Sequence, residues 1–79
     1  MPFIHVRAYT GRDTELKKKA AKAIMKAASE AMDTPETAFT VVFEDVEKDV
    51  WEKEIVIPIM QPLKEAKKVF IDHGSEVEF

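Results

Sequence analysis

Apolar and polar residues alternate along the first segment of the chain. In residues 2–9, one face of an extended strand would carry Ile4, Val6 and Ala8, and the other face more polar side chains. Residues 10–13 break this pattern, because Gly11 suits a turn and Asp13 suits a helix N-cap. We therefore predict a strand over residues 2–9, followed by a turn.

The next segment has the composition and spacing of a helix. Residues 14–32 are rich in alanine, lysine and glutamate, which favour helix. Their apolar members recur at helical spacing and form one stripe: Leu16, Ala20, Ile24, Ala27, Ala28 and Ala31. Pro35 disfavours helical geometry at Thr34 and should end the helix. The many small alanines predict a helix that lies close against a sheet.

A second strand is expected over residues 38–44, where bulky or β-branched residues occupy both faces, as in a buried sheet. A strand, a long helix and a strand form a β-α-β unit, and the two strands of such a unit run parallel. One unit cannot cover both faces of its own sheet. We therefore predict an α/β (α+β) fold that homo-oligomerisation completes.

The last part of the chain has a mixed pattern. Apolar residues between positions 45 and 70 follow helical spacing, but prolines interrupt it. We predict a short helix over residues 49–56 and another over residues 58–69, with Pro58 in its first turn. A short strand is expected through Val77 and Phe79.

The length of 79 residues allows a single domain, residues 1–79, with a marginal core of its own. The chain has no cysteine, and His5 and His73 lie too far apart for a local metal-ligand motif. We expect His5 to be structural or at a subunit contact, and His73 to lie in a solvated turn. Self-association is the remaining source of extra stability.

Charge and hydropathy exclude several classes of protein. The formal net charge of −3 does not indicate the basic surface that binds nucleic acid. No apolar run approaches the roughly 18 residues of a membrane span, and the N-terminus lacks the pattern of a signal peptide. The expected location is cytoplasmic.

Pro2 is the strongest candidate for a catalytic residue. If Met1 is removed, Pro2 becomes the N-terminus and presents a secondary amine on a rigid ring. An α-amino group titrates near about 8, and desolvation or a nearby cation lowers that pKa, giving a base near neutral pH. The same proline also suits the start of an edge strand, where its missing N–H costs nothing.

The run from Pro2 to Arg12, PFIHVRAYTGR, resembles the start of the 4-oxalocrotonate tautomerase family. The resemblance continues through the long helix and the Asp33-Thr34-Pro35 turn to Trp51, where the family has an aromatic residue that lines its site. The region after Trp51 looks like the longer subgroup of the family. Its members can form dimers, although trimers and hexamers also occur among relatives.

This resemblance implies a tautomerase that interconverts the enol and keto forms of a 2-oxo acid without metal or cofactor. Pro2 would be the general base and acid. Arg12 would bind a substrate carboxylate or keto oxygen, as a guanidinium can in a bidentate pair. Trp51 would wall the pocket, exclude water and lower the pKa of the proline amine.

The chain departs from the family at two positions. Well-studied members carry a second arginine where this chain has Thr40, so we expect Thr40 to face a substrate with one carboxylate, such as an aryl or alkyl enol-pyruvate. Dehalogenating relatives carry an arginine where this chain has Tyr9, so dehalogenation is not predicted and Tyr9 is expected to pack. The alternative function is a non-catalytic oligomeric module that keeps the fold for binding or assembly.

Overall fold

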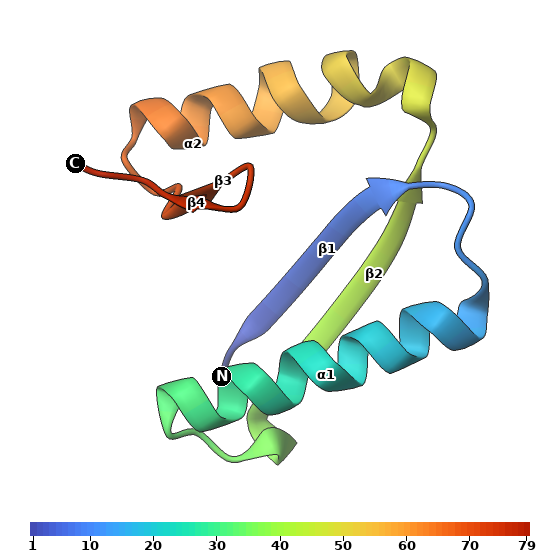
Figure 1. Ribbon diagram of the computed structural model, residues 1–79, viewed down its shortest axis with the longest axis vertical. Helices are drawn as coiled ribbons and strands as arrows, with labels where there is room; N and C mark the ends of the chain where they lie inside the picture. Colours follow the sequence, from blue (N-terminus) through green and yellow to red (C-terminus); the bar gives the residue numbers. More distant parts are fainter. The chain divides into compact units, whose positions relative to one another are not determined.

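The computed structural model describes all 79 residues, and the chain divides into two compact units, Met1–Val46 and Glu47–Phe79 (Figure 1). None of the helices is both long enough and apolar enough to cross a lipid bilayer. The single domain expected over residues 1–79 stays a prediction.

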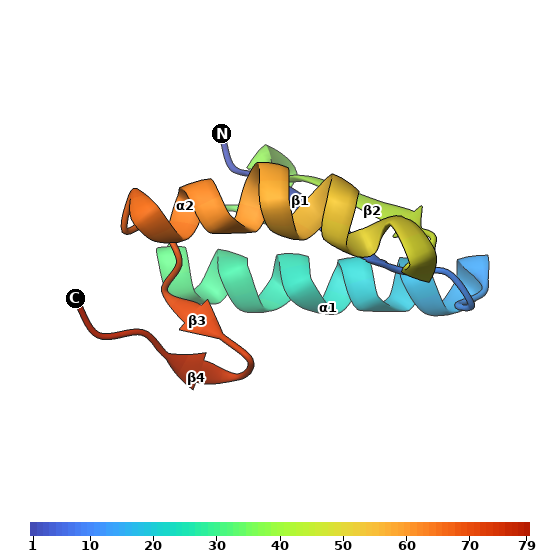
Figure 2. The same ribbon diagram turned by 90° about the horizontal axis from the view of Figure 1, so that it is seen from above.

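The N-terminal unit is a parallel β-α-β unit. Its elements are, in chain order, β1 (Phe3–Tyr9), α1 (Thr14–Met32), a 3-10 turn η1 (Glu36–Ala38) and β2 (Thr40–Val46). The two strands pair in parallel, with Phe3 opposite Thr40 and Tyr9 opposite Val46. Helix α1 packs along one face of this pair, as Figures 1 and 2 show. The predicted fold class and the parallel pairing are confirmed.

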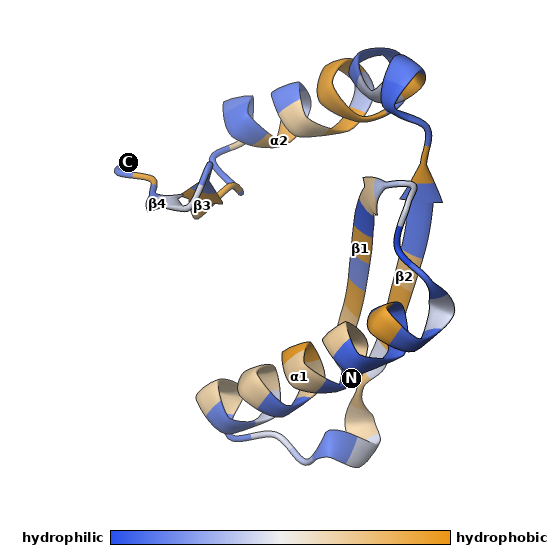
Figure 3. Cartoon of the chain, turned by 45° about the vertical axis from the view of Figure 1, so that its right-hand side comes forward, coloured by the Kyte–Doolittle hydropathy of each residue, from blue (hydrophilic) through white to orange (hydrophobic).

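The alternation along β1 separates a covered face from an open one, and Figure 3 shows it as alternating colours. Ala8 lies opposite Asp45, whose carboxylate binds a lysine of α1, so the face of Ala8 is the one toward the helix. The residues of the other face of β1 are exposed: Phe3, His5, Arg7 and Tyr9. Only Ile55, in the C-terminal unit, is buried in this single chain. The N-terminal unit therefore has no fully buried core of its own.

Both ends of α1 are closed by local hydrogen bonds. At the N-terminus, the side chain of Asp13 accepts the N–H of Leu16 at 2.8 Å, the N-cap that the sequence predicts. At the C-terminus, Asp33 adopts a left-handed conformation (φ 51°) and Thr34 donates its N–H to the carbonyl of Ser29 at 3.1 Å. The predicted bounds of the helix are confirmed, and this left-handed turn ends it.

The predicted bounds of the second strand, residues 38–44, are wrong, because the strand begins at Thr40 and ends at Val46. The 3-10 turn η1 accounts for the later start. The N–H groups of Ala38 and Phe39 donate to the carbonyls of Pro35 and Glu36, at 3.0 and 3.1 Å, and are not available to a strand.

The C-terminal unit begins with an uninterrupted helical stretch. It consists of a 3-10 turn η2 (Lys48–Val50), a π-helix η3 (Glu52–Met60) and a short α2 (Gln61–Glu65). The predicted separation into helices over 49–56 and 58–69 is wrong, since Pro58 lies inside η3. In an α-helix the proline ring clashes with the carbonyl four residues back. The stretch around Pro58 instead has the wider π geometry, and Gln61 donates to the carbonyl of Val56.

The chain ends in a small antiparallel hairpin, β3 (Ile71–Asp72) with β4 (Ser75–Glu76). His73 and Gly74 connect them with φ angles of 48° and 79°, as a type I′ turn requires. The predicted strand through Val77 and Phe79 is wrong, because β4 ends before Val77. The predicted turn at His73 is confirmed, and its side chain is 91% exposed.

Lys67 offers a stability test within the C-terminal unit. It follows α2 with a left-handed φ of 59°, a conformation that favours glycine over a residue with a Cβ. We expect Lys67→Gly to raise the free energy of unfolding by about 0.5–1 kcal/mol, measured by urea denaturation. Lys68→Gly, which removes the same charge where φ is not positive, should instead lower it. Equal losses in both variants would contradict the left-handed assignment.

Candidate functional site

Pro2 lies directly before β1 and is half-buried. Its carbonyl accepts the N–H of Thr40 at 3.1 Å, so the start of β1 is tied to the start of β2. The structure thus brings together two of the predicted site residues, Pro2 and the exposed Thr40. Met1 is fully exposed.

Arg12 lies at the other end of β1, in the loop of residues 10–13. Its Nη1 donates to the carbonyl of Tyr9 at 2.9 Å, which leaves the Nε and Nη2 edge of the guanidinium for a ligand. The loop is itself joined to β2, because Thr10 donates its N–H to the carbonyl of Val46 at 3.2 Å. The guanidinium is therefore held at the carboxyl end of the strand pair.

The structure does not bring Pro2 and Arg12 together within one chain. The strand between them has seven residues. At a rise of about 3.3 Å per residue, the ring nitrogen and the carbonyl of Tyr9 lie on the order of 20 Å apart. A guanidinium hydrogen-bonded to that carbonyl cannot contact a substrate held at Pro2 of the same chain.

Trp51 belongs to the C-terminal unit, where it is half-buried and joins η2 to η3 with helical backbone angles. Tyr9 ends β1 on the open face of the strand pair and is 42% exposed. The predicted packing of Tyr9 and the predicted site role of Trp51 stay predictions.

A charged cluster on the open face of the strand pair was missed by the sequence analysis. His5 Nε2 contacts Glu44 Oε1, and Arg7 Nε lies 3.6 Å from the same carboxylate oxygen. The parallel register, which pairs Arg7 with Glu44, produces this cluster. The alternation pattern indicates that His5 and Arg7 share a face, but the sequence does not give the register that places Glu44 of the second strand beside them.

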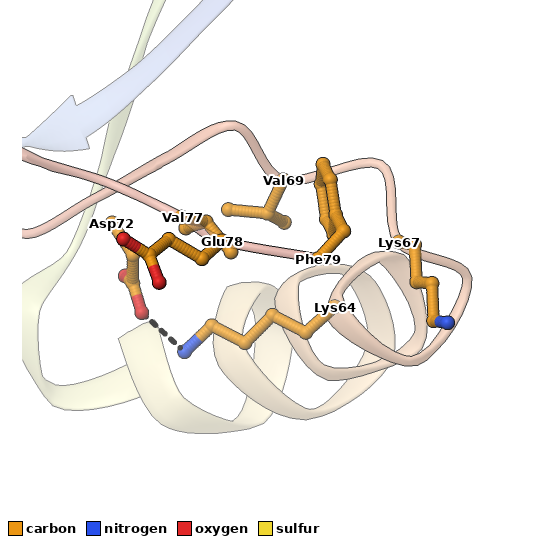
Figure 4. A pocket seen from close by; sticks show the side chains of 7 residues that line it. All are labelled: Lys64, Lys67, Val69, Asp72, Val77, Glu78 and Phe79. Carbon is orange, nitrogen blue, oxygen red and sulfur yellow. Dashed lines mark ion pairs between the residues drawn. The ribbon is translucent and has the colours of Figure 1, made fainter.

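The C-terminal unit contains a cavity of about 380 Å³ (Figure 4). Its lining residues are Lys64, Lys67, Val69, Asp72, Val77, Glu78 and Phe79. Across this cavity Lys64 forms an ion pair with Asp72 at 3.1 Å. None of the predicted site residues lines it. Nowhere in the chain do three or more potential metal ligands come together.

The fold and the position of Pro2 define a small α/β protein built on a parallel β-α-β unit, with a proline directly before its first strand. Residues 2–52 match the protein family described as Tautomerase enzyme, and this match covers more than half of the chain. The chain therefore belongs to the tautomerase family, and this membership indicates an enzyme of the isomerase type. Comparisons with curated proteins and with solved structures gave no match.

Proposed function

We propose that the processed chain, from which Met1 has been removed, is a cofactor-independent tautomerase that interconverts the enol and keto forms of a 2-oxo acid. The observation that carries this proposal is the position of Pro2. In a member of the tautomerase family, Pro2 lies between an exposed Met1 and the first strand. It is half-buried, and its carbonyl accepts the N–H of Thr40. Removal of Met1 converts an amide nitrogen into a secondary amine at that place.

The proposed reaction is a proton transfer through this amine. The neutral ring nitrogen of Pro2 takes the proton of the enol hydroxyl, and the resulting ammonium returns a proton to the carbon at the other end of the double bond. The hydroxyl oxygen becomes the keto oxygen, and the amine returns to its starting state. No net proton is gained or lost, so a single base is sufficient.

Arg12 is the proposed ligand of the substrate carboxylate. It would contribute to the site that contains Pro2 of a second copy of the chain. Strand β1 pairs with β2 along one edge only, and its other edge is unpaired in this chain. Two β1 strands related by a two-fold axis run antiparallel when they pair edge to edge. Such pairing brings the Pro2 end of each strand to the Arg12 end of the other. We therefore propose a homo-oligomer, with a dimer as its simplest form.

The substrate is proposed to carry one carboxylate. Thr40, which is uncharged, lies beside Pro2, so Arg12 is the cation proposed to bind there. The processed chain should ketonise phenylenolpyruvate and act much more slowly on a dienol with two carboxylates. Ultraviolet assays on both classes of substrate test this proposal. Faster turnover of the dicarboxylate, or no turnover of any enol acid, would contradict it.

Trp51 enters the proposal through the family resemblance, as an apolar wall beside the amine. Desolvation disfavours the charged amine and lowers its pKa. Trp51→Ala should therefore raise that pKa, so a smaller fraction of the amine is neutral at a given pH. The expected result is an alkaline shift of the rising limb of the kcat/KM profile. An unchanged profile would remove Trp51 from this role.

The second candidate function is a non-catalytic module that assembles through the open face of the strand pair. The observation in its favour is the exposure of this face, including the large side chain of Phe3 at 65%. With Met1 retained, the nitrogen of Pro2 is an amide and has no basicity. Intact mass of the protein from its native host separates the two functions, because a mass that keeps methionine counts against catalysis.

A further inference from the structure

The loop that carries Arg12 is joined to β2 on both of its sides. On the side of β1, Thr10 donates its N–H to the carbonyl of Val46 at 3.2 Å. On the side of α1, Lys17 donates its backbone N–H to the carbonyl of Asp13 at 3.1 Å, and its Nζ reaches Oδ2 of Asp45 at 2.8 Å. The loop is therefore held between two connections to the last two residues of β2.

The ion pair between Lys17 and Asp45 differs from an ordinary surface pair. The two side chains are 22% and 33% exposed, whereas those of the neighbouring pair, Lys18 and Glu15, are 63% and 86% exposed at a separation of 3.7 Å. Partial exclusion of water strengthens the first pair, while a fully solvated pair contributes little. The Lys17–Asp45 pair also joins two different elements, α1 and β2, rather than two turns of one helix.

The loop needs such a restraint because of its backbone. Gly11 lies within it at a φ of 124° and has no side chain that packs. Glycine allows a wide range of backbone angles, so the loop has little stiffness of its own. The Arg12 side chain is also bonded to the carbonyl of Tyr9, the last residue of β1, so its position depends on how the loop leaves the strand.

We propose that Lys17 and Asp45 are positioning residues that fix the Arg12 guanidinium for one substrate carboxylate. This inference rests on the proposed function, in which Arg12 binds that carboxylate. Neither residue touches the substrate. The pair fixes the position of the first turn of α1 relative to the end of β2. It thereby fixes the position of the four-residue loop and of the Arg12 guanidinium on it.

The test compares Lys17→Met in the processed protein with Lys18→Met, which removes the same charge from the exposed pair. Lys17→Met should raise KM for phenylenolpyruvate about tenfold with kcat within about twofold, since a misplacement of about 1 Å can cost up to a hundredfold. Its kcat/KM for the methyl ester, which lacks the carboxylate, should stay at the wild-type value. Lys17→Arg, which keeps the cation, should restore KM, and Lys18→Met should not change it.

Equal losses on the acid and the ester, or an unchanged KM for the acid, would overturn the positioning role. If Lys17→Met does not fold, Asp45→Asn provides the same comparison. Amide hydrogen exchange at Gly11 and Arg12 gives a readout independent of activity, and it should accelerate in Lys17→Met alone. Arg12→Ala separates the positioning role from the proposed carboxylate site. If this variant leaves KM unchanged, Arg12 does not bind the carboxylate, even where the exchange data show that Lys17 restrains the loop.

Discussion

Replacement of Pro2 by alanine in the processed chain is expected to lower kcat for phenylenolpyruvate by about a hundredfold or more, the usual contribution of a positioned general base. Met1 is also removed when alanine follows it, so the processed variant keeps a free N-terminal amine. That amine is primary and is not held in a ring, so its lone pair has no fixed direction toward the substrate. The secondary amine on a fixed ring would be lost.

The fold should survive this substitution. The backbone carbonyl of residue 2 accepts the N–H of Thr40 and so connects this residue to β2. Alanine keeps this carbonyl. Circular dichroism and thermal unfolding check this point. Pro35→Ala is the matched control, because it removes a proline far from the N-terminus and should keep wild-type kcat. Near-wild-type turnover by Pro2→Ala would show that the base lies elsewhere.

A mixture of two impaired variants is expected to regain activity. Pro2→Ala and Arg12→Ala each impair every site in their own oligomers. If Pro2 and Arg12 of different copies form one site, a mixed dimer contains one site with both native residues. After random exchange of subunits, half of the dimers are mixed, so about a quarter of wild-type activity should return.

The separation of the two residues along β1 is the reason for this expectation. The guanidinium is bonded to the carbonyl of Tyr9, at the far end of the strand from Pro2. The experiment denatures the two variants together, refolds them and measures ketonisation against each variant refolded alone. If the mixture is no more active than the sum of its parts, Pro2 and Arg12 do not share a site across copies.

Local signals in the sequence predicted most of the N-terminal unit. The alternation around Ile4 and Val6 and the N-cap at Asp13 depend on near neighbours, and the structure has both. The second strand was displaced because the 3-10 turn before it uses N–H groups that look available in the sequence. Pro58 was read as a helix boundary, but the π geometry around it keeps the helical stretch continuous.

The candidate site was predictable as a set of residue types and not as an arrangement. Pro2, Arg12 and Thr40 were identified from their order in the chain and from the resemblance to one family. Their distances depend on the strand between Pro2 and Arg12 and on the register that places Thr40 beside Pro2. The cluster of His5 and Glu44 depends on the same register, which no single segment of the sequence encodes.

The central claim is that a free ring nitrogen at position 2 performs the proton transfer. The most direct measurement starts from chains that keep Met1 and removes this residue in vitro with a methionine aminopeptidase. Intact mass gives the processed fraction at each time, and an ultraviolet assay gives the ketonisation rate of the same sample. We expect the rate to begin near the uncatalysed value and to rise in proportion to the processed fraction. A full rate in chains that still carry Met1 would contradict the claim.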